Sequence, residues 1–215
     1  MIIFSEGGKG GVGKSLITGL VMYHYVSIGQ NPVLIETDTS NPDTHKIHCD
    51  LFKTILCEID TQDGWIAFLS HADENRDNPV VVNCGARNER SIKQWGSMIP
   101  MLGIPFKVLF TINSELDSVL LLKSYLETVD PRVVTVVKNG FFGQETDFRR
   151  YDNSKTREKI NSHLYVPELL TLAATRYYSE RTPIHKLAEV LNFGERLFFE
   201  SWVKKLQTQF AVVLS

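Results

Sequence analysis

Short runs of apolar residues alternate along the chain with stretches in which apolar residues recur at helical spacing. Unbroken apolar runs of this length predict strands that are buried on both faces of a parallel sheet. They lie at residues 2–4, 33–37, 79–85, 106–112 and 133–137, with a weaker run at 53–59. The intervening pattern predicts helices after residue 15, near 88–101, after 113 and twice within 184–212. Strands that alternate with helices predict a doubly wound α/β fold, in which helices cover both faces of a mostly parallel sheet.

Residues 7–15 read Gly-Gly-Lys-Gly-Gly-Val-Gly-Lys-Ser and lie between the first predicted strand and the first predicted helix. From Gly8 onward they fit the phosphate-loop pattern Gly-x4-Gly-Lys-Ser. Glycine lets backbone N–H groups wrap a β/γ-phosphate closely, and a helix N-terminus favours an anion. Lys14 places a positive charge on the phosphates, and the Ser15 hydroxyl is a natural Mg²⁺ ligand. The segment predicts a nucleotide site with contacts from Gly8, Gly10, Gly11, Val12, Gly13, Lys14, Ser15 and Leu16.

Length and composition fit one globular domain that spans residues 1–215. A formal net charge of −2 gives no overall electrostatic attraction to nucleic acid. The three cysteines are few and not closely paired, which is typical of a reduced compartment. The first residues lack the features of a signal peptide, and no run reaches the roughly 18 apolar residues of a membrane span. We therefore expect a cytoplasmic protein without a membrane partner.

The string Lys9-Gly10-Gly11-Val12-Gly13-Lys14-Ser15 resembles the deviant Walker A signature of the ParA/MinD superfamily. The resemblance implies a homodimer that closes over ATP and Mg²⁺, with Lys9 reaching the nucleotide of the partner subunit. Glu36-Thr37-Asp38 resembles the second motif of the family, usually Asp-x-Asp, whose second acid orients the attacking water. Asp38 matches that acid, whereas Glu36 is one carbon longer than the usual first residue. Lys9, Lys14 and Asp38 are therefore the residues expected to act in ATP hydrolysis.

The strand that ends at Asn83 departs from the family pattern, because relatives commonly end it with a Walker B aspartate that holds Mg²⁺ through water. An amide supplies no negative charge, although its oxygen can accept a hydrogen bond from a metal-bound water. The Pro-rich switch that often follows is replaced here by Gly85-Ala86-Arg87. The expected metal residues are Ser15, Asp38 and Asn83, and the departure weakens the expectation of hydrolysis more than that of binding.

Two later positions match residues that line the base pocket in MinD-like proteins. Asn139 ends the strand at 133–137, and an amide suits the Watson–Crick edge of adenine. Pro167 lies in a Val-Pro-Glu segment that resembles the short Pro-Glu segment of the family. The resemblance therefore implies that Asn139 and Pro167 contact the base.

Two further segments each allow a structural and a functional interpretation. Residues 149–159 carry five basic side chains against two acidic ones, and they form either a contact surface for duplex DNA or a solvated loop. The tail repeats Phe198, Trp202, Leu206 and Phe210 at near-helical spacing. This stripe predicts a helix packed on the sheet in preference to a membrane-binding helix.

Residues 36–43 and 137–143 look most like those of plasmid-encoded relatives of the TraL/StbC type, which are linked to conjugal transfer and plasmid stability. The resemblance implies a slowly hydrolysing ATP switch with a plasmid-transfer or partition protein as partner. Two alternatives remain open from the sequence. One is an ATP-bound assembly module that does not hydrolyse ATP, and the other is a small metabolic ligase or kinase on the same fold, as in the dethiobiotin synthetase relatives.

Overall fold

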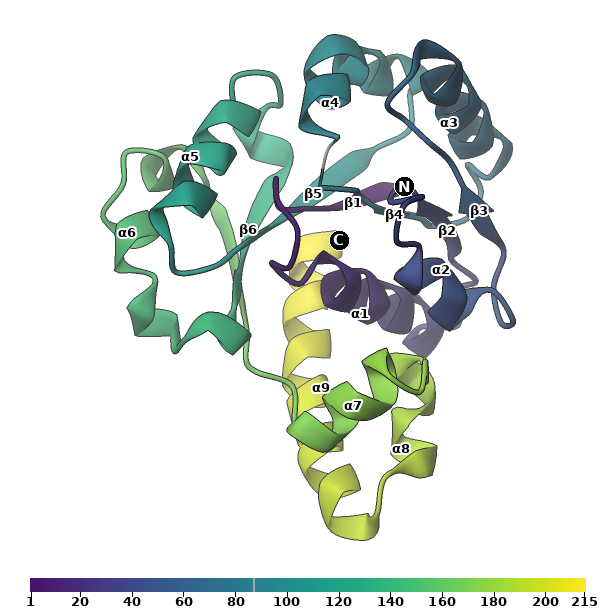
Figure 1. The fold of residues 1–215 in the computed structure, drawn as a ribbon, viewed down its shortest axis with the longest axis vertical. Coiled ribbons are helices and arrows are strands. Elements are labelled where there is room, and N and C mark those ends of the chain that lie inside the picture. Colours follow the sequence, from purple (N-terminus) through teal and green to yellow (C-terminus); the bar gives the residue numbers. More distant parts are fainter. Residues whose placement is uncertain (87) are drawn as a thin grey trace.

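The computed structural model describes residues 1–86 and 88–215, so that Arg87 of the 85–87 segment lies outside the described residues. The described strands form a seven-stranded, all-parallel sheet in the order β3-β2-β4-β1-β5-β6-β7 (Figure 1). Their bounds are β1 Ile2–Glu6, β2 Val33–Glu36, β3 Thr54–Leu56, β4 Val80–Asn83, β5 Phe106–Ile112, β6 Val134–Asn139 and β7 Ser162–Val166. The predicted doubly wound α/β fold is confirmed.

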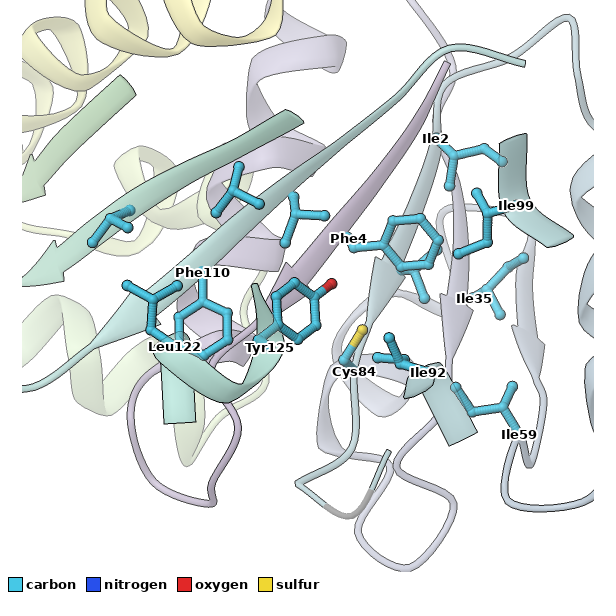
Figure 2. Close-up of a cluster of buried hydrophobic side chains, with 14 of the residues drawn as sticks. Ile2, Phe4, Ile35, Ile59, Cys84, Ile92, Ile99, Phe110, Leu122 and Tyr125 are labelled. Carbon is cyan, nitrogen blue, oxygen red and sulfur yellow. The ribbon is translucent and has the colours of Figure 1, made fainter. Parts of the chain in front are cut away.

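Helices cover both faces of this sheet (Figure 1). They are α1 Lys14–Ser27, α2 Asp43–His48, α3 Gln62–Glu74, α4 Glu89–Trp95, α5 Leu116–Tyr125, α6 Arg149–Asp152, α7 Thr171–Tyr178, α8 Leu187–Val190 and α9 Phe193–Leu214. Because successive side chains of a strand point to opposite faces, Ile2 and Phe4 of β1 pack on one side and Ile3 on the other. Figure 2 shows the first side, where Phe4 and Ile2 lie among side chains from α4 and α5. The second side is covered by α1, α7 and α9.

The sequence predicted six of the seven described strands and missed β7, and it gave the bounds of several elements wrongly. The helix predicted at 88–101 is an α-helix only to Trp95 and continues as a 3₁₀ helix over Gly96–Leu102. Pro100 has no N–H to donate to the carbonyl four residues earlier, so an α-helix cannot continue regularly there. The strand predicted at 53–59 is confined to Thr54–Leu56.

In its N-terminal half, the buried face of α9 is shifted by one position along the sequence from the predicted stripe. Phe198 is 76% exposed, whereas Phe199 is 3% exposed. The buried face consists of Phe199, Val203, Leu206, Phe210 and Leu214. Repeated steps of four residues drift around a helix of 3.6 residues per turn, and the step of three from Val203 to Leu206 corrects that drift. The helix packs on the sheet side as predicted, through this corrected face.

Candidate functional site

The glycine-rich loop joins β1, at the centre of the sheet, to α1. Gly8, Gly11 and Gly13 have positive φ angles of 68°, 74° and 105°, a region that residues with a side chain rarely adopt. A Cβ on Gly13 would also lie 2.3 Å from the Asn139 side chain. At the end of β1, the buried Glu6 carboxylate accepts hydrogen bonds from the N–H groups of Gly7 and Gly8, at 3.0 and 3.1 Å. The loop is therefore shaped by its own backbone requirements and by one carboxylate beneath it.

The start of α1 opens into a cavity of about 370 Å³ at the carboxyl ends of the strands. Its lining brings together Lys14 and Ser15 from the loop, Asp38 from the end of β2 and Asn83 from the end of β4. The other lining residues are Gly10, Gly11, Gly13, Asn41, Asp43, Cys84 and Tyr178. The Lys14 ammonium donates to the carbonyl of Lys9 at 2.6 Å. The positions expected to bind phosphate and metal thus meet in one cavity.

A second cavity of about 290 Å³ shares Gly11, Gly13 and Tyr178 with the first. It is lined mainly by apolar groups, and its other residues are Leu16, Asn139, Phe141, Glu168, Leu169, Thr171 and Ala174. The Asn139 amide donates to the carbonyl of Val12 at 2.8 Å, and its oxygen accepts from the N–H of Phe141 at 3.1 Å. Asn139 thus ties the strand end of β6 to the loop.

Pro167, expected at the base, does not line this cavity, although the next two residues do. Its carbonyl instead accepts a hydrogen bond of 3.0 Å from the Trp202 indole of α9. Pro167 therefore lies in the wall behind the cavity, where it joins the chain after β7 to the C-terminal helix.

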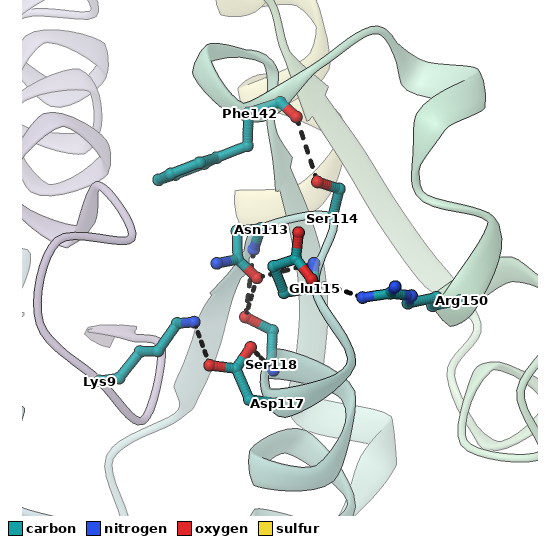
Figure 3. A network of polar contacts seen from close by, with 8 residues as sticks. All are labelled: Lys9, Asn113, Ser114, Glu115, Asp117, Ser118, Phe142 and Arg150. Carbon is teal, nitrogen blue, oxygen red and sulfur yellow. Dashed lines mark hydrogen bonds and ion pairs between the residues drawn. The ribbon is translucent and has the colours of Figure 1, made fainter.

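Lys9 lines neither cavity, and its side chain contacts α5 (Figure 3). Its ammonium lies 2.5 Å from the Asp117 carboxylate, and this hydrogen bond lowers the pKa of Asp117. Ser118, the next residue of α5, donates to the Asn113 oxygen at 2.6 Å at the end of β5. The same oxygen accepts from the N–H of Glu115, so Asn113 caps the approach to α5. The lysine expected to act on a partner subunit is therefore held within its own subunit.

Ser114 does not cap α5, contrary to what a serine before a helix suggests. The residue at the cap is Glu115, without a side-chain cap bond, and the Ser114 hydroxyl donates to the carbonyl of Phe142 (Figure 3). The Asn113 oxygen instead accepts from the N–H of Glu115 and from the Ser118 hydroxyl of the first turn.

Glu36 and Asn83 are paired across neighbouring strands, at matching positions of β2 and β4. The Asn83 amide donates to both oxygens of the Glu36 carboxylate, at 2.9 and 3.0 Å. Its own oxygen accepts from the Thr18 hydroxyl of α1 at 3.0 Å. Burial raises the pKa of Glu36 to about 7, although hydrogen bonds from the Asp38 N–H and the Asn83 amide act in the opposite direction. Asn83 is thus held in one orientation by an acceptor and a donor.

The residues around the first cavity fit a magnesium ion by the chemistry of their donors. Ser15 offers a hydroxyl oxygen, Asp38 a carboxylate and Asn83 an amide oxygen, all of them hard oxygen ligands. Mg²⁺ keeps several waters and is commonly bound through one or two carboxylates together with substrate phosphates. Within residues 1–86 and 88–215 there is no cluster of three or more His, Cys, Asp and Glu side chains arranged for a metal. A site with only two lining acids, Asp38 and Asp43, that depends on bound phosphate fits this chain better than a site built from protein ligands alone.

Several residues of the site carried no signal in the sequence. Thr18 is a single polar residue in apolar surroundings, Glu6 lies between Ser5 and the glycines, and Asp117 is an acid in the first turn of a helix, where acids are common. Tyr178 and Phe141 line cavities but resemble core aromatics in the sequence. The one available hint was at Thr18, which follows Ser15 by three residues and so shares its helix face.

The basic segment 149–159 lies on α6 and the turns that follow it, on the side of α5. Arg150 forms an ion pair of 2.5 Å with Glu115, and Arg157 donates to the carbonyl of Ile160. Arg149, Lys155 and Lys159 are exposed. Part of the positive charge is thus engaged within the protein.

The fold resembles that of two solved cell division proteins. The MinD chain of the MinC:MinD complex from Aquifex aeolicus matches with a TM-score of 0.58 at 14% identity, over 97% of this chain and 96% of that one. FtsY from Thermotoga maritima matches with a TM-score of 0.59 at 16% identity over 78% of this chain, which spans 62% of the FtsY chain. Identities this low show the fold alone, which is that of the MinD-type P-loop NTPases.

No helix among the described residues has the length and apolar character needed to cross a bilayer. No protein-family model matches the sequence. The sequence is, however, 35% identical over 204 residues to protein MobD of Acidithiobacillus ferrooxidans, an alignment that covers 91% of this chain and 90% of that protein. The similarity thus extends well beyond the glycine-rich loop, and this chain belongs to the MobD family.

Proposed function

We propose that this protein is an ATP-binding dimer switch of the ParA/MinD type. The observation that carries the proposal is the first cavity, where Lys14 and Ser15 at the start of α1 face Asp38 and Asn83 at the strand ends. In this proposal the phosphates lie on the loop N–H groups and Lys14, and the base occupies the second, more apolar cavity beside Asn139. Binding of ATP favours a closed homodimer, and loss of the γ-phosphate reopens it.

Hydrolysis needs a positioned water and neutralised charge more than covalent chemistry. Asp38 lines the cavity and is the residue proposed to orient the attacking water. Mg²⁺, held by Ser15 and the phosphates with Asp38 and Asn83 nearby, neutralises charge on the phosphates when it is bound. Slow turnover suits a switch whose state has to persist.

The setting we propose is plasmid mobilisation or plasmid stability. The support is the name of the MobD relative and the resemblance of residues 36–43 and 137–143 to plasmid-encoded proteins of the TraL/StbC type. A plasmid-transfer or partition protein is then the expected partner. Duplex DNA, contacted through the exposed basic residues of 149–159, is an accessory ligand in this proposal.

An ATP-bound assembly module that does not hydrolyse ATP is the second candidate. The observation that favours it is Asn83, whose amide is neutral and whose oxygen already accepts a hydrogen bond from Thr18. Such a module would dimerise with ATP and stay closed.

The first test measures binding of a fluorescent ATP analogue to wild type, Lys14→Ala and Lys204→Ala. Lys204 is an exposed residue of α9 and matches the charge change without touching the cavity. We expect Lys14→Ala to weaken binding at least about tenfold, because a charge-assisted contact to phosphate is lost, and Lys204→Ala to bind like wild type. Equal binding by all three proteins would refute the nucleotide site.

The second test separates the two candidates. Phosphate release from Mg-ATP is measured for wild type and Asp38→Ala, with and without duplex DNA, while sedimentation reports dimer formation in the same samples. Release that requires Asp38 supports the switch, and stimulation by DNA supports the accessory role of 149–159. Dimers that form with ATP in wild type, without release above the Asp38→Ala level, would support the assembly module instead.

A further inference from the structure

Glu36 is a buried carboxylate that has no cation beside it. Its side chain is 0% exposed, and among residues 1–86 and 88–215 no ion pair involves it. Removing an ionised carboxylate from water is costly unless a positive charge or several donors compensate for it. Here the compensation comes from dipoles: the N–H of Asp38, the amide of Asn83 and, to a smaller degree, the backbone of His45. The carboxyl group thus lies next to the candidate nucleotide site without a counter-charge beside it.

The two main donors to Glu36 belong to the two strand ends that line the cavity. The Asp38 N–H lies 2.9 Å from one carboxylate oxygen, and the Asn83 amide nitrogen lies 2.9 and 3.0 Å from the two oxygens. Because the nitrogen of Asn83 is fixed on Glu36, its oxygen is directed to the Thr18 hydroxyl at the start of α1, one turn after Ser15. A single carboxylate therefore orients both Asp38 and Asn83.

The charges of the site explain why an acid is retained in this position. Ser15 and Asn83 are neutral, and Asn83 occupies the strand end directly opposite Glu36. This pair of positions can carry one negative charge whether the acid lies on β2 and the amide on β4, as here, or the amide lies on β2 and the acid on β4. We propose that Glu36 is a positioning residue of the magnesium–nucleotide site, which holds Asp38 and Asn83 in place and supplies from behind them the negative charge that Asn83 lacks. This inference rests on the proposed nucleotide-binding function.

The test uses exchange of the acid and the amide, each by a substitution of nearly equal size. In Glu36→Gln the charge is lost. The new amide nitrogen then faces the amide nitrogen of Asn83, so that two donors meet where one of them had an acceptor. In Asn83→Asp two carboxylates face each other at about 3 Å, which disfavours ionisation of both. In the double variant Glu36→Gln/Asn83→Asp, the new amide on β2 can donate to the new carboxylate on β4, while its oxygen still accepts from the Asp38 N–H, and the charge returns. Thr135→Val, which changes a buried residue of β6 whose hydroxyl donates to the Ser162 hydroxyl, controls for disturbance of the sheet.

The readout is the Mg²⁺ concentration that gives half-maximal binding of a fluorescent ATP analogue, with binding in EDTA as the baseline. We expect Glu36→Gln to raise this concentration about tenfold, the lower end of the effect of groups that orient metal ligands, with little change in the EDTA baseline. The half-maximal Mg²⁺ concentration of the double variant should return to within about threefold of the wild-type value. That of Thr135→Val should equal the wild-type value. A merely structural role of Glu36 would instead weaken binding in EDTA and in Mg²⁺ alike.

Three results would overturn the inference, and they are distinguishable from one another. If wild type binds no nucleotide, the proposed function fails and the inference falls with it. If wild type binds nucleotide with a Mg²⁺ requirement that Glu36→Gln leaves unchanged, the function stands and Glu36 has no part in the site. If Glu36→Gln does not fold, the double variant decides. A folded double variant that binds nucleotide without a Mg²⁺ requirement contradicts the inference. A folded double variant that retains the Mg²⁺ requirement supports it.

Discussion

His48, at the end of α2, is a polar ring in surroundings that offer it no partner. It is 0% exposed, and neither ring nitrogen has a hydrogen-bond partner among the described residues. Its ring packs against Phe52, which in turn packs against His185. Burial, and to a smaller degree the nearby His185, lowers the pKa of His48 to about 3. The neutral ring is therefore strongly favoured in the folded state.

This predicts acid sensitivity that His48→Leu should remove. The pKa of histidine in an unfolded chain is about 6.5, so the unfolded state binds more protons than the folded state between pH 6.5 and 3. Stability is full above pH 6.5 and is lost as the pH falls. At pH 5 the loss amounts to about 2 kcal/mol, from 1.5 pH units at 1.36 kcal/mol each. Urea unfolding of wild type and His48→Leu at pH 7.5 and pH 5 should show the variant gaining about that much relative stability at the lower pH.

The other histidines with lowered pKa, His163 and His185, are present in both proteins and largely cancel from the comparison. At pH 7.5 the variant should already be at least as stable as wild type, because it removes two unpaired buried nitrogens. A stability difference that is the same at both pH values would contradict the role given to His48.

Residues whose role depends on their neighbours in the chain were predictable from the sequence. Lys14 and Ser15 are of this kind, because the loop pattern, the strand before it and the helix after it all lie within a short segment. The partners of the site were not predictable. Asp117 is 108 residues from Lys9, and Thr18 is 65 residues from Asn83. Only the strand order brings these pairs together, and apolar runs do not specify strand order.

At the scale of elements, the strands with a continuous apolar run were clear in the sequence because both faces are covered, whereas β7, which contains Ser162, His163 and Tyr165, was not predicted. Short helices were not clear. The helices α2 and α7 have only six and eight residues, which is too few for a helical period to stand out. The long α9 was visible, but its exact face depended on which of two adjacent phenylalanines points inward. Burial separates Phe198 from Phe199, and periodicity alone does not.

The face of α9 can be tested with two phenylalanines of the same helix. Phe210 is fully buried against the second core and Phe198 is exposed. Phe210→Ala should lower the free energy of unfolding by about 3–5 kcal/mol, because it leaves a cavity in the core. Phe198→Ala should change it by less than about 0.5 kcal/mol, as is usual for surface positions. Denaturant unfolding of both variants gives the answer, and a large loss in Phe198→Ala would show that the helix packs through the other face.

At the scale of the whole molecule, the position of Lys9 bears on assembly. In the single subunit its ammonium is paired with Asp117, at exposures of 27% and 57% for the two side chains. Exposed pairs of this kind contribute only about 0.2–1 kcal/mol, so a phosphate group can displace the carboxylate readily. If Lys9 serves the nucleotide of a partner subunit, this pair has to break whenever the dimer forms. Asp117 would then oppose dimerisation by the small free energy of the pair.

Asp117→Asn should therefore make ATP-dependent dimerisation easier. A released pair of about 0.5–1 kcal/mol lowers the ATP concentration at half-maximal dimerisation by roughly two- to fivefold. Sedimentation velocity with a non-hydrolysable ATP analogue and Mg²⁺ measures this concentration. Lys9→Ala should prevent dimerisation in both the wild-type and the Asp117→Asn background, because the contact in trans is then missing in either case.

The matched control is Asp130→Asn, which removes the same charge from an exposed acid that follows the C-terminal end of α5 and pairs with Arg132. It should leave the ATP dependence unchanged. An equal shift in Asp130→Asn would mean that dimerisation responds to net charge and not to the release of Lys9. Unaltered dimerisation in Asp117→Asn, together with normal dimers in Lys9→Ala, would mean that Lys9 acts within its own subunit. The ion pair between Lys9 and Asp117 (Figure 3) would then persist in the dimer, and assembly would not have to break it.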